Sequence, residues 1–168
     1  IPGPIYEYDI NSAYPAAMLH LPCPLHTTWH AFKGEPDRSW PLYLAKVGFD
    51  HISSSPLCGL PIRRNGRLFW ASRGIGTYWS PEIDAARRLT TYVTNWKGGY
   101  FAKRTCTCHS FDWVRELYET RKRIGKAARG YPIKLGINGL YGKLAQRQGA
   151  APFRDHIAAG LITAIVRG

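Results

Sequence analysis

Hydrophobic and polar positions follow a strand-like period in the first two thirds of the chain. Short runs that alternate, or that are continuously apolar, predict strands over residues 4–9, 41–50, 74–79 and 91–96. Asn65-Gly66 separates two extended runs, which is typical of a tight hairpin, and residues 74–79 are expected to extend the same sheet. Residues 22–40 hold several proline, tryptophan and histidine residues, so this stretch is predicted to be loop.

The remaining pattern is helical. Apolar positions recur every three to four residues and predict helices over residues 12–20, 80–90, 111–129, 132–146 and 156–167. Pro15 must lie in the first turn of the first helix, because proline disrupts helix interiors. Ser80-Pro81-Glu82 has the cap-then-proline form of a helix start. Because strands dominate the first part and helices the second, the predicted fold class is α+β.

The predicted helix 132–146 carries two adjacent stripes. At about 100° per residue, one arc of about 60° is apolar and is expected to pack into the core. This arc consists of Ile133, Ile137, Leu140 and Leu144. A second arc, about 100° away, displays an ammonium, an amide and a phenol on Lys134, Asn138 and Tyr141. Tyr141 alone is equally well explained as a core aromatic.

Three glycines, Gly136, Gly139 and Gly142, lie in the same predicted helix. Each costs about 1 kcal/mol relative to alanine in a helix interior. We interpret them as a sign that another molecule approaches the helix backbone closely. The alternative is a poorly formed helix or a loop.

The preceding helix, 111–129, has a basic stripe opposite its apolar face. Arg115, Lys122, Lys126 and Arg129 form the stripe, and Arg121 and Arg123 flank it. A solvated charged face is the usual explanation for such a row. However, two antiparallel helices joined by a short turn would aim this stripe and Lys134 into one cleft. Several cations in one cleft suit a triphosphate.

The overall charge points to a polyanionic partner. Lysine and arginine number 23 against 11 acids, which gives a formal charge of +12, and nucleic acid is the partner that this excess favours. A basic surface that only aids solubility is the alternative. No apolar run approaches the roughly 20 residues of a membrane span, and the N-terminus lacks a signal-peptide pattern. We therefore expect a soluble intracellular protein without a membrane partner.

The cysteines do not predict a metal site. Among Cys23, Cys58, Cys106 and Cys108, only the last two are close in sequence, within Cys-Thr-Cys-His at 106–109. Zinc sites usually combine two separated Cys or His pairs, and no second pair is evident. Reduced thiols of unassigned role are the expectation.

Two motifs resemble a known family. YDINSAYP (8–15) and KLGINGLYGK (134–143), in this order, resemble motifs A and B of family B DNA polymerases, most closely the protein-primed polymerases of phages and linear plasmids. The resemblance implies an α+β fold: a partial polymerase palm with helical fingers and a β-rich insertion between the motifs. The implied regions are palm at 1–18, an insertion resembling the terminal-protein-contacting region at 19–105, fingers with motif B at 106–146, and a palm helix at 147–168.

The resemblance also implies roles for individual residues. Asp9 would be the catalytic metal-binding carboxylate and Ile10 would offer its carbonyl to the same ions. Ser12, Tyr14, Arg121, Lys122, Lys134, Asn138 and Tyr141 would bind the incoming dNTP, with Tyr14 as the steric gate against ribonucleotides. Gly142 and Lys143 would lie on the DNA. A turn or cap role for Asp9 is the alternative from the residues alone.

Together these roles imply a DNA-directed DNA polymerase that adds dNTPs to a primer 3′ end with two Mg²⁺ ions. Its partners would be primer-template DNA, dNTP and a terminal protein. Its location would be the host cytoplasm if viral, or an organelle if plasmid-derived. Two departures stand out: glycine replaces the family's usual serine at 139, and no Asp-x-Asp supplies the second metal carboxylate. We therefore expect an inactive fragment of the enzyme. The alternative is a non-catalytic nucleic-acid-binding remnant.

Overall fold

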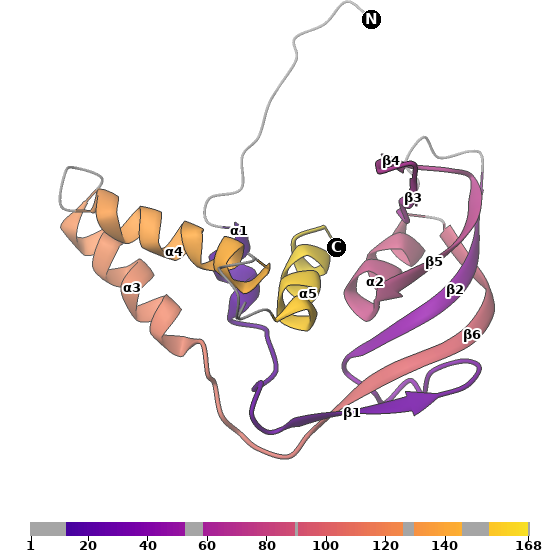
Figure 1. The fold of residues 1–168 in the computed structure, drawn as a ribbon, viewed down its shortest axis with the longest axis horizontal. Helices are drawn as coiled ribbons and strands as arrows, with labels where there is room; N and C mark the ends of the chain where they lie inside the picture. Colours follow the sequence, from indigo (N-terminus) through magenta and orange to yellow (C-terminus); the bar gives the residue numbers. More distant parts are fainter. Residues whose placement is uncertain (1–12, 53–58, 90, 126–129, 146–154, 168) are drawn as a thin grey trace, which may run out of the picture.

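The computed structural model describes residues 13–52, 59–89, 91–125, 130–145 and 155–167. Most of the helices gather at one end of the molecule, and an antiparallel sheet with one helix packed on it forms the other end (Figure 1). This arrangement confirms the predicted α+β class. The predicted strand 4–9 lies outside the described residues.

The main sheet has four antiparallel strands in the order β1-β6-β2-β5. They are β1 (Thr27–Phe32), β2 (Tyr43–His51), β5 (Arg73–Trp79) and β6 (Thr91–Arg104). The strand predicted at 91–96 is therefore too short. β6 continues through Gly98 and Gly99, where a Cβ on Gly99 would collide with the Leu44 carbonyl oxygen. The two glycines thus permit the close approach and the register shift at Lys46/Val47 that lengthen the strand.

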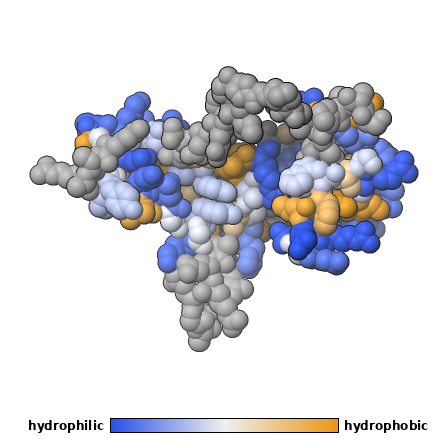
Figure 2. All heavy atoms as spheres, turned by 90° about the horizontal axis from the view of Figure 1, so that it is seen from above, coloured by the Kyte–Doolittle hydropathy of each residue, from blue (hydrophilic) through white to orange (hydrophobic). Residues whose placement is uncertain are grey.

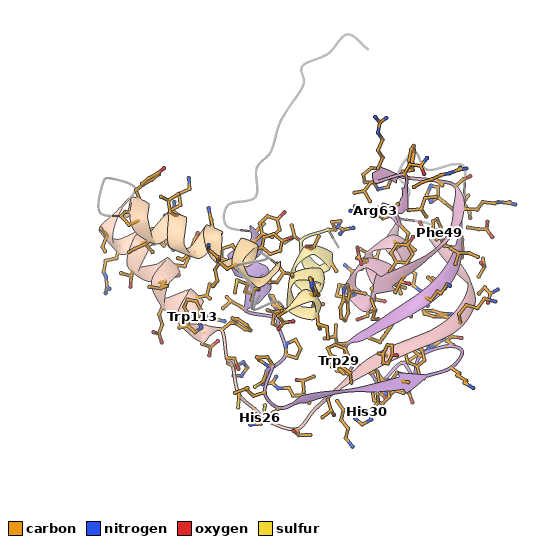
Figure 3. All side chains as sticks on the ribbon, viewed as in Figure 1. His26, Trp29, His30, Phe49, Arg63 and Trp113 are labelled. Carbon is orange, nitrogen blue, oxygen red and sulfur yellow. The ribbon has the colours of Figure 1, made fainter. Side chains whose placement is uncertain are left out.

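The loop predicted over 22–40 is wrong in its middle, because β1 forms there. Its residues pair with the last six of β6, from Thr27↔Arg104 to Phe32↔Gly99. Trp29 points from β1 toward the helices, and its ring meets that of Trp79 edge-on at 5.6 Å (Figure 3). The proline-rich composition concealed this strand, because β6, its partner among the described residues, is remote in sequence.

The Asn65-Gly66 hairpin is confirmed. Asn65 and Gly66 have φ values of 50° and 77°, between β3 (Ile62–Arg64) and β4 (Arg67–Phe69). Residues 74–79 do not extend this hairpin, contrary to the prediction. Their strand β5 instead pairs with β2 over seven residues, which is a longer ladder than the three-residue hairpin strands offer.

Helix α2 (Ser80–Arg88) covers one face of the sheet (Figure 1). The helix begins as predicted, except that Trp79 and not Ser80 is the N-cap residue; its backbone N–H donates to Glu82 Oε2 at 3.1 Å. Ile83 and Ala86 are fully buried against the sheet. The core they join also contains Tyr43, Ala45, Val47, Phe49, Leu60 and Tyr78.

The other helices form the second core. They are α1 (Ala13–Met18), α3 (Asp112–Ile124), α4 (Tyr131–Ala145) and α5 (His156–Arg167), close to the predicted bounds. Pro15 lies in the first turn of α1, as predicted. α3 ends five residues early, because Gly125 with φ of 88° terminates it. Met18, Val114, Ile137, Leu161 and Ile162 are buried in this core.

Both ends of the molecule expose hydrophilic and hydrophobic side chains. Figure 2 shows hydrophilic side chains over the helical end and the sheet end, with hydrophobic side chains exposed among them. No helix of the described residues is long and apolar enough to cross a membrane.

Candidate functional site

The two sequence motifs meet through a pair of aromatic rings. Tyr14 on α1 and Tyr141 on α4 stack with ring centroids 4.4 Å apart and an interplanar angle of 17°. Tyr14 is 40% exposed and Tyr141 is half-buried. Residues separated by most of the chain thus form one small aromatic platform with access to solvent.

A hydrogen-bond chain fixes this platform. The Tyr141 hydroxyl lies 2.8 Å from Thr163 Oγ1, and Thr163 in turn donates to the Ala159 carbonyl oxygen at 2.9 Å. Thr163 lies on α5, so three helices hold the Tyr141 ring. Sequence reasoning missed Thr163, although it is the one hydroxyl residue in the apolar helix HIAAGLITAIVR.

The apolar stripe of α4 faces the core as predicted, whereas the polar stripe is exposed except for Tyr141, which is half-buried and packs against the same core. Ile137 is 3% exposed, and Ile133, Leu140 and Leu144 pack against the same core, which confirms the apolar stripe. Lys134 and Asn138 are exposed on the adjacent face. At 1.5 Å per residue, the stripe from Lys134 to Tyr141 is about 10 Å long.

Cations gather at the far end of this stripe. Arg121 and Lys122 lie in the last turn of α3, and Lys134 lies in the first turn of α4. The two helices pack against each other and are joined by residues 125–130, as predicted (Figure 1). Arg121 is half-buried, whereas Lys122 and Lys134 are exposed. One end of the helix pair is therefore strongly basic.

The glycine face of α4 is open. A Cβ added to Gly136, Gly139 or Gly142 would meet no atom of the structure within 4 Å. No packing within the described part of the chain therefore explains these glycines. Gly142 and the neighbouring Lys143 are both exposed.

The proposed metal ligands Asp9 and Ile10, and the proposed dNTP-binding residue Ser12, lie outside the described residues. Their relation to Lys134 and Tyr14 therefore stays a prediction. A different set of potential metal ligands is described, however. Cys23, His26, Cys106 and Cys108 come together at the base of the sheet, and sequence reasoning missed this cluster because it sought a second Cys-x-x-Cys pair and overlooked Cys23-x-x-His26.

Comparison with known proteins identifies the family. The model for type B DNA polymerases of organellar and viral origin matches residues 1–151. A crystal form of phi29 DNA polymerase is 16% identical with a TM-score of 0.63, covering 94% of this chain and 33% of that chain. Phi29 DNA polymerase complexed with primer-template DNA and incoming nucleotide is 21% identical with a TM-score of 0.61, covering 83% and 26%.

These structural matches show a shared fold, and the chain spans a third or less of the length of these phi29 polymerase structures. The search of curated proteins returned no match. The family match nonetheless extends over nearly the whole sequence and includes both motifs. The chain therefore belongs to the organellar and viral type B DNA polymerases.

Proposed function

We propose that this chain is the part of a template-directed DNA polymerase that holds the incoming dNTP between motifs A and B. The observation that carries the proposal is the stack of Tyr14 on Tyr141, which joins the two motifs in space. The structure of phi29 DNA polymerase that shares this fold is a complex with primer-template DNA and incoming nucleotide substrates. That complex supports DNA and dNTP as partners of this chain.

The stripe on α4 suits an extended nucleotide. Its basic end, with Lys134 and one or both of Arg121 and Lys122, would neutralise the triphosphate charges. Its aromatic end lies about 10 Å away, which is about the span from a terminal phosphate to the sugar and base. Tyr14 would lie against the sugar and exclude a 2′-hydroxyl, and Asn138 with Tyr141 would line the base-pair pocket.

Asp9 and the Ile10 carbonyl would hold Mg²⁺ beside the triphosphate, and Ser12 would contact the triphosphate itself. Bound Mg²⁺ would stabilise the attacking 3′-oxygen and the leaving pyrophosphate. Carboxylate and carbonyl oxygens are the ligands that this hard cation prefers. A two-metal site needs a second carboxylate, and the 168 residues contain no Asp-x-Asp. The proposal is therefore that the complete site, and nucleotide addition itself, require more than these residues.

Protein-primed replication of viral or plasmid DNA is the setting that the resemblance favours. Within it, residues 19–105 would be the insertion that meets a terminal protein and duplex DNA, and 106–146 the fingers. Gly142 and Lys143 would face the DNA. The absence of Asp-x-Asp also supports a second candidate, a nucleic-acid-binding remnant without catalysis, which would bind DNA but add no nucleotide in any longer form.

The gate role of Tyr14 is tested in a complete polymerase that contains this chain. Tyr14→Val should lower the ratio of kcat/KM for dNTP over rNTP by about 10- to 100-fold, since a removed contact of this size is worth that much discrimination. Tyr14→Phe is the matched control, because it keeps the ring and should keep the ratio. Single-nucleotide incorporation kinetics give both values. If Tyr14→Val discriminates between dNTP and rNTP as well as the wild type does, Tyr14 is not the steric gate. If the complete protein incorporates no nucleotide at all, the non-catalytic nucleic-acid-binding remnant is favoured.

A further inference from the structure

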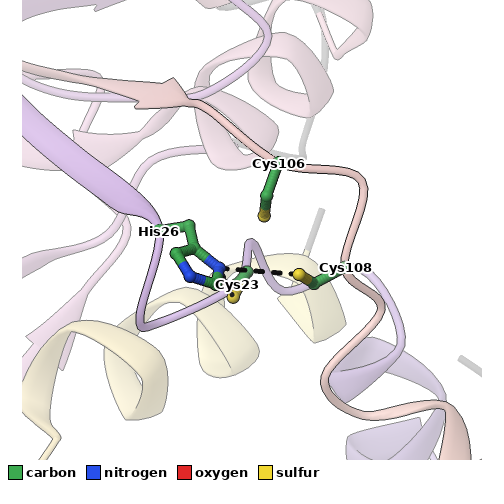
Figure 4. Close-up of side chains that lie close together, drawn as sticks. All are labelled: Cys23, His26, Cys106 and Cys108. Atoms are coloured by element: carbon green, nitrogen blue, oxygen red, sulfur yellow. Dashed lines mark hydrogen bonds between the residues drawn. The ribbon is translucent and has the colours of Figure 1, made fainter.

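A cluster of three thiols and one imidazole lies where the sheet joins the helices. The potential ligand atoms of Cys23, His26, Cys106 and Cys108 all lie within 4.8 Å of one another (Figure 4). All three cysteines are free thiols. We propose that these four side chains bind one structural Zn²⁺ ion as a closed Cys₃His site.

The distances between the potential ligand atoms fit tetrahedral zinc. Zn–S and Zn–N bonds of about 2.3 and 2.0–2.1 Å at a tetrahedral angle place sulfur and nitrogen about 3.6 Å apart. The His26 Nδ1 atom lies 3.5 Å from Cys23 Sγ and 3.5 Å from Cys108 Sγ. These separations are close to those the ion would impose. Four protein ligands leave no open position, which is the hallmark of a structural site.

The backbone brings the two ligand pairs together. His26 immediately precedes β1, and Cys106 and Cys108 follow the end of β6, which pairs with β1 at Thr27↔Arg104. The Thr105 N–H and hydroxyl both donate to the His26 carbonyl oxygen, at 3.2 and 2.9 Å. Ligands 82 residues apart, such as His26 and Cys108, are thus aligned by the sheet itself.

The surroundings favour a thiolate-rich centre. Three thiolates and Zn²⁺ carry a net charge of −1, and the nearby Arg104 guanidinium donates to the Cys108 carbonyl oxygen. Like charges crowded together are stabilised by a central cation.

The ligand set distinguishes zinc from a disulfide pair. A disulfide would use two of the cysteines and leave the third thiol and His26 Nδ1 without a shared role. The spacing is Cys-x-x-His followed by Cys-x-Cys, which is two separated pairs as structural zinc sites present them.

The ion would tie two segments of the fold together, residues 23–26 and 106–108. Cys23 lies five residues after α1, whose last residue is Met18, and Cys108 lies four residues before Asp112, where α3 begins. One ion would therefore join the chain that enters the sheet to the chain that leaves it for the helical hairpin. Closing so long a loop is expected to stabilise the fold appreciably.

The first test measures metal in the 168-residue chain purified under reducing conditions without chelator. Mass spectrometry should find one zinc per chain. The ligand variants Cys23→Ser, His26→Asn, Cys106→Ser and Cys108→Ser should each fall below about 0.2 zinc per chain. His109→Asn, one residue from Cys108, and Cys58→Ser are matched controls that should keep the zinc.

A second test uses the wild-type chain, so its outcome does not depend on whether the ligand variants fold. Wild-type chain stripped of metal and titrated with Co²⁺ should show the ligand-field bands of tetrahedral cobalt and a thiolate-to-cobalt charge-transfer band. Zinc should displace the cobalt, and its removal should lower Tm by on the order of 10 °C. Wild type without stoichiometric zinc, a disulfide among the three cysteines, bound iron instead of zinc, or octahedral cobalt would each overturn the proposal.

Discussion

At the scale of single residues, two polar contacts connect helices that are distant in sequence. Thr163 orients the Tyr141 ring, and Arg167 Nη1 lies 3.1 Å from Oε1 of Glu82. Glu82 is 7% exposed, and burial raises the pKa of its carboxyl despite the hydrogen bond from Trp79 and the charge of Arg167. This ion pair joins the start of α2 to the end of α5, and so the sheet end to the helical end.

Removing the positive charge of Arg167 should destabilise the fold by an amount that depends on pH. Arg167→Met leaves a nearly buried carboxylate without its partner, and we expect a loss of about 1–2 kcal/mol at pH 7, since Arg167 is partly exposed to solvent. The folded-state pKa of Glu82 lies above its unfolded value, so the cost of its charge is present above that pKa and is relieved as pH falls through it.

Urea unfolding of wild type and variant at a series of pH values measures this loss. The difference between them should shrink as pH falls through the folded-state pKa of Glu82, because a protonated, neutral carboxyl no longer needs the Arg167 charge. Arg88→Met, an exposed arginine on α2, is the control and should have little effect at any pH. A loss that stays constant with pH would mean that packing of the Arg167 stem, and not its charge, is what matters.

At the scale of elements, α4 combines a buried stripe, a polar stripe and a bare glycine face. The apolar stripe explains why the helix forms, because Ile137 anchors it in the core. Its glycines are unexplained by packing, since a Cβ at these positions would meet nothing within 4 Å. These glycines lower the stability of the helix relative to alanine. We infer that a nucleotide or a DNA backbone lies against this face when bound.

Gly139→Ala should therefore separate stability from activity. Alanine in an open helix interior should raise the free energy of unfolding by about 0.5–1 kcal/mol. In a complete polymerase containing the chain, the same change should lower kcat/KM for dNTP by about tenfold or more, because a methyl group would intrude on the bound substrate or DNA. Chemical unfolding and single-turnover incorporation give the two values. A stabilised variant with full activity would show that nothing approaches this face.

At the scale of the whole molecule, the positive charge and the shape suggest where DNA binds. The net charge of +12 favours any polyanion, but Arg121, Lys122 and Lys134 concentrate cations at the tip of the helical hairpin. Arg63 on β3 lies at the opposite end of the molecule (Figure 3). The contributions of the two ends to DNA binding can therefore be compared by neutralising two cations at each end.

The affinity of the 168-residue chain for primed DNA should fall steeply with salt. If about five phosphates are contacted, the plot of log K against log salt should have a slope of about −4 to −5. The measurement is made without dNTP, so that Arg121 and Lys122 are available to DNA phosphates. Neutralising both to Gln should then reduce the steepness by about 2, because each lost contact removes about one counterion. Fluorescence anisotropy at several salt concentrations measures the slopes.

The matched control neutralises Arg63 and Arg64 to Gln at the other end. These arginines are exposed, and the slope should change little. An equal effect of both pairs would indicate binding driven by net charge alone. A larger effect of neutralising Arg63 and Arg64 would place the DNA on the β-rich part of the chain.

Much of the local structure was predictable because it depends on neighbours in sequence. The helical period over 132–146, the turn at Asn65-Gly66 and the proline-led start at Ser80 all appear where predicted. The order of the two polymerase motifs likewise identified the family, which the match over residues 1–151 confirms. These features need no knowledge of what lies across the fold.

The amino-acid sequence by itself thus determined the class of fold, the family and the faces of α4. Only the tertiary structure decided that β1 exists, that β5 leaves the hairpin for β2, and that Tyr14 stacks on Tyr141. Only the tertiary structure likewise decided the Cys/His cluster, in which His26 contacts Cys108, 82 residues further along the chain. Strand pairing and side-chain clusters depend on contacts between segments that are distant in sequence. Neither residue propensity nor spacing along the chain specifies which of these segments will meet.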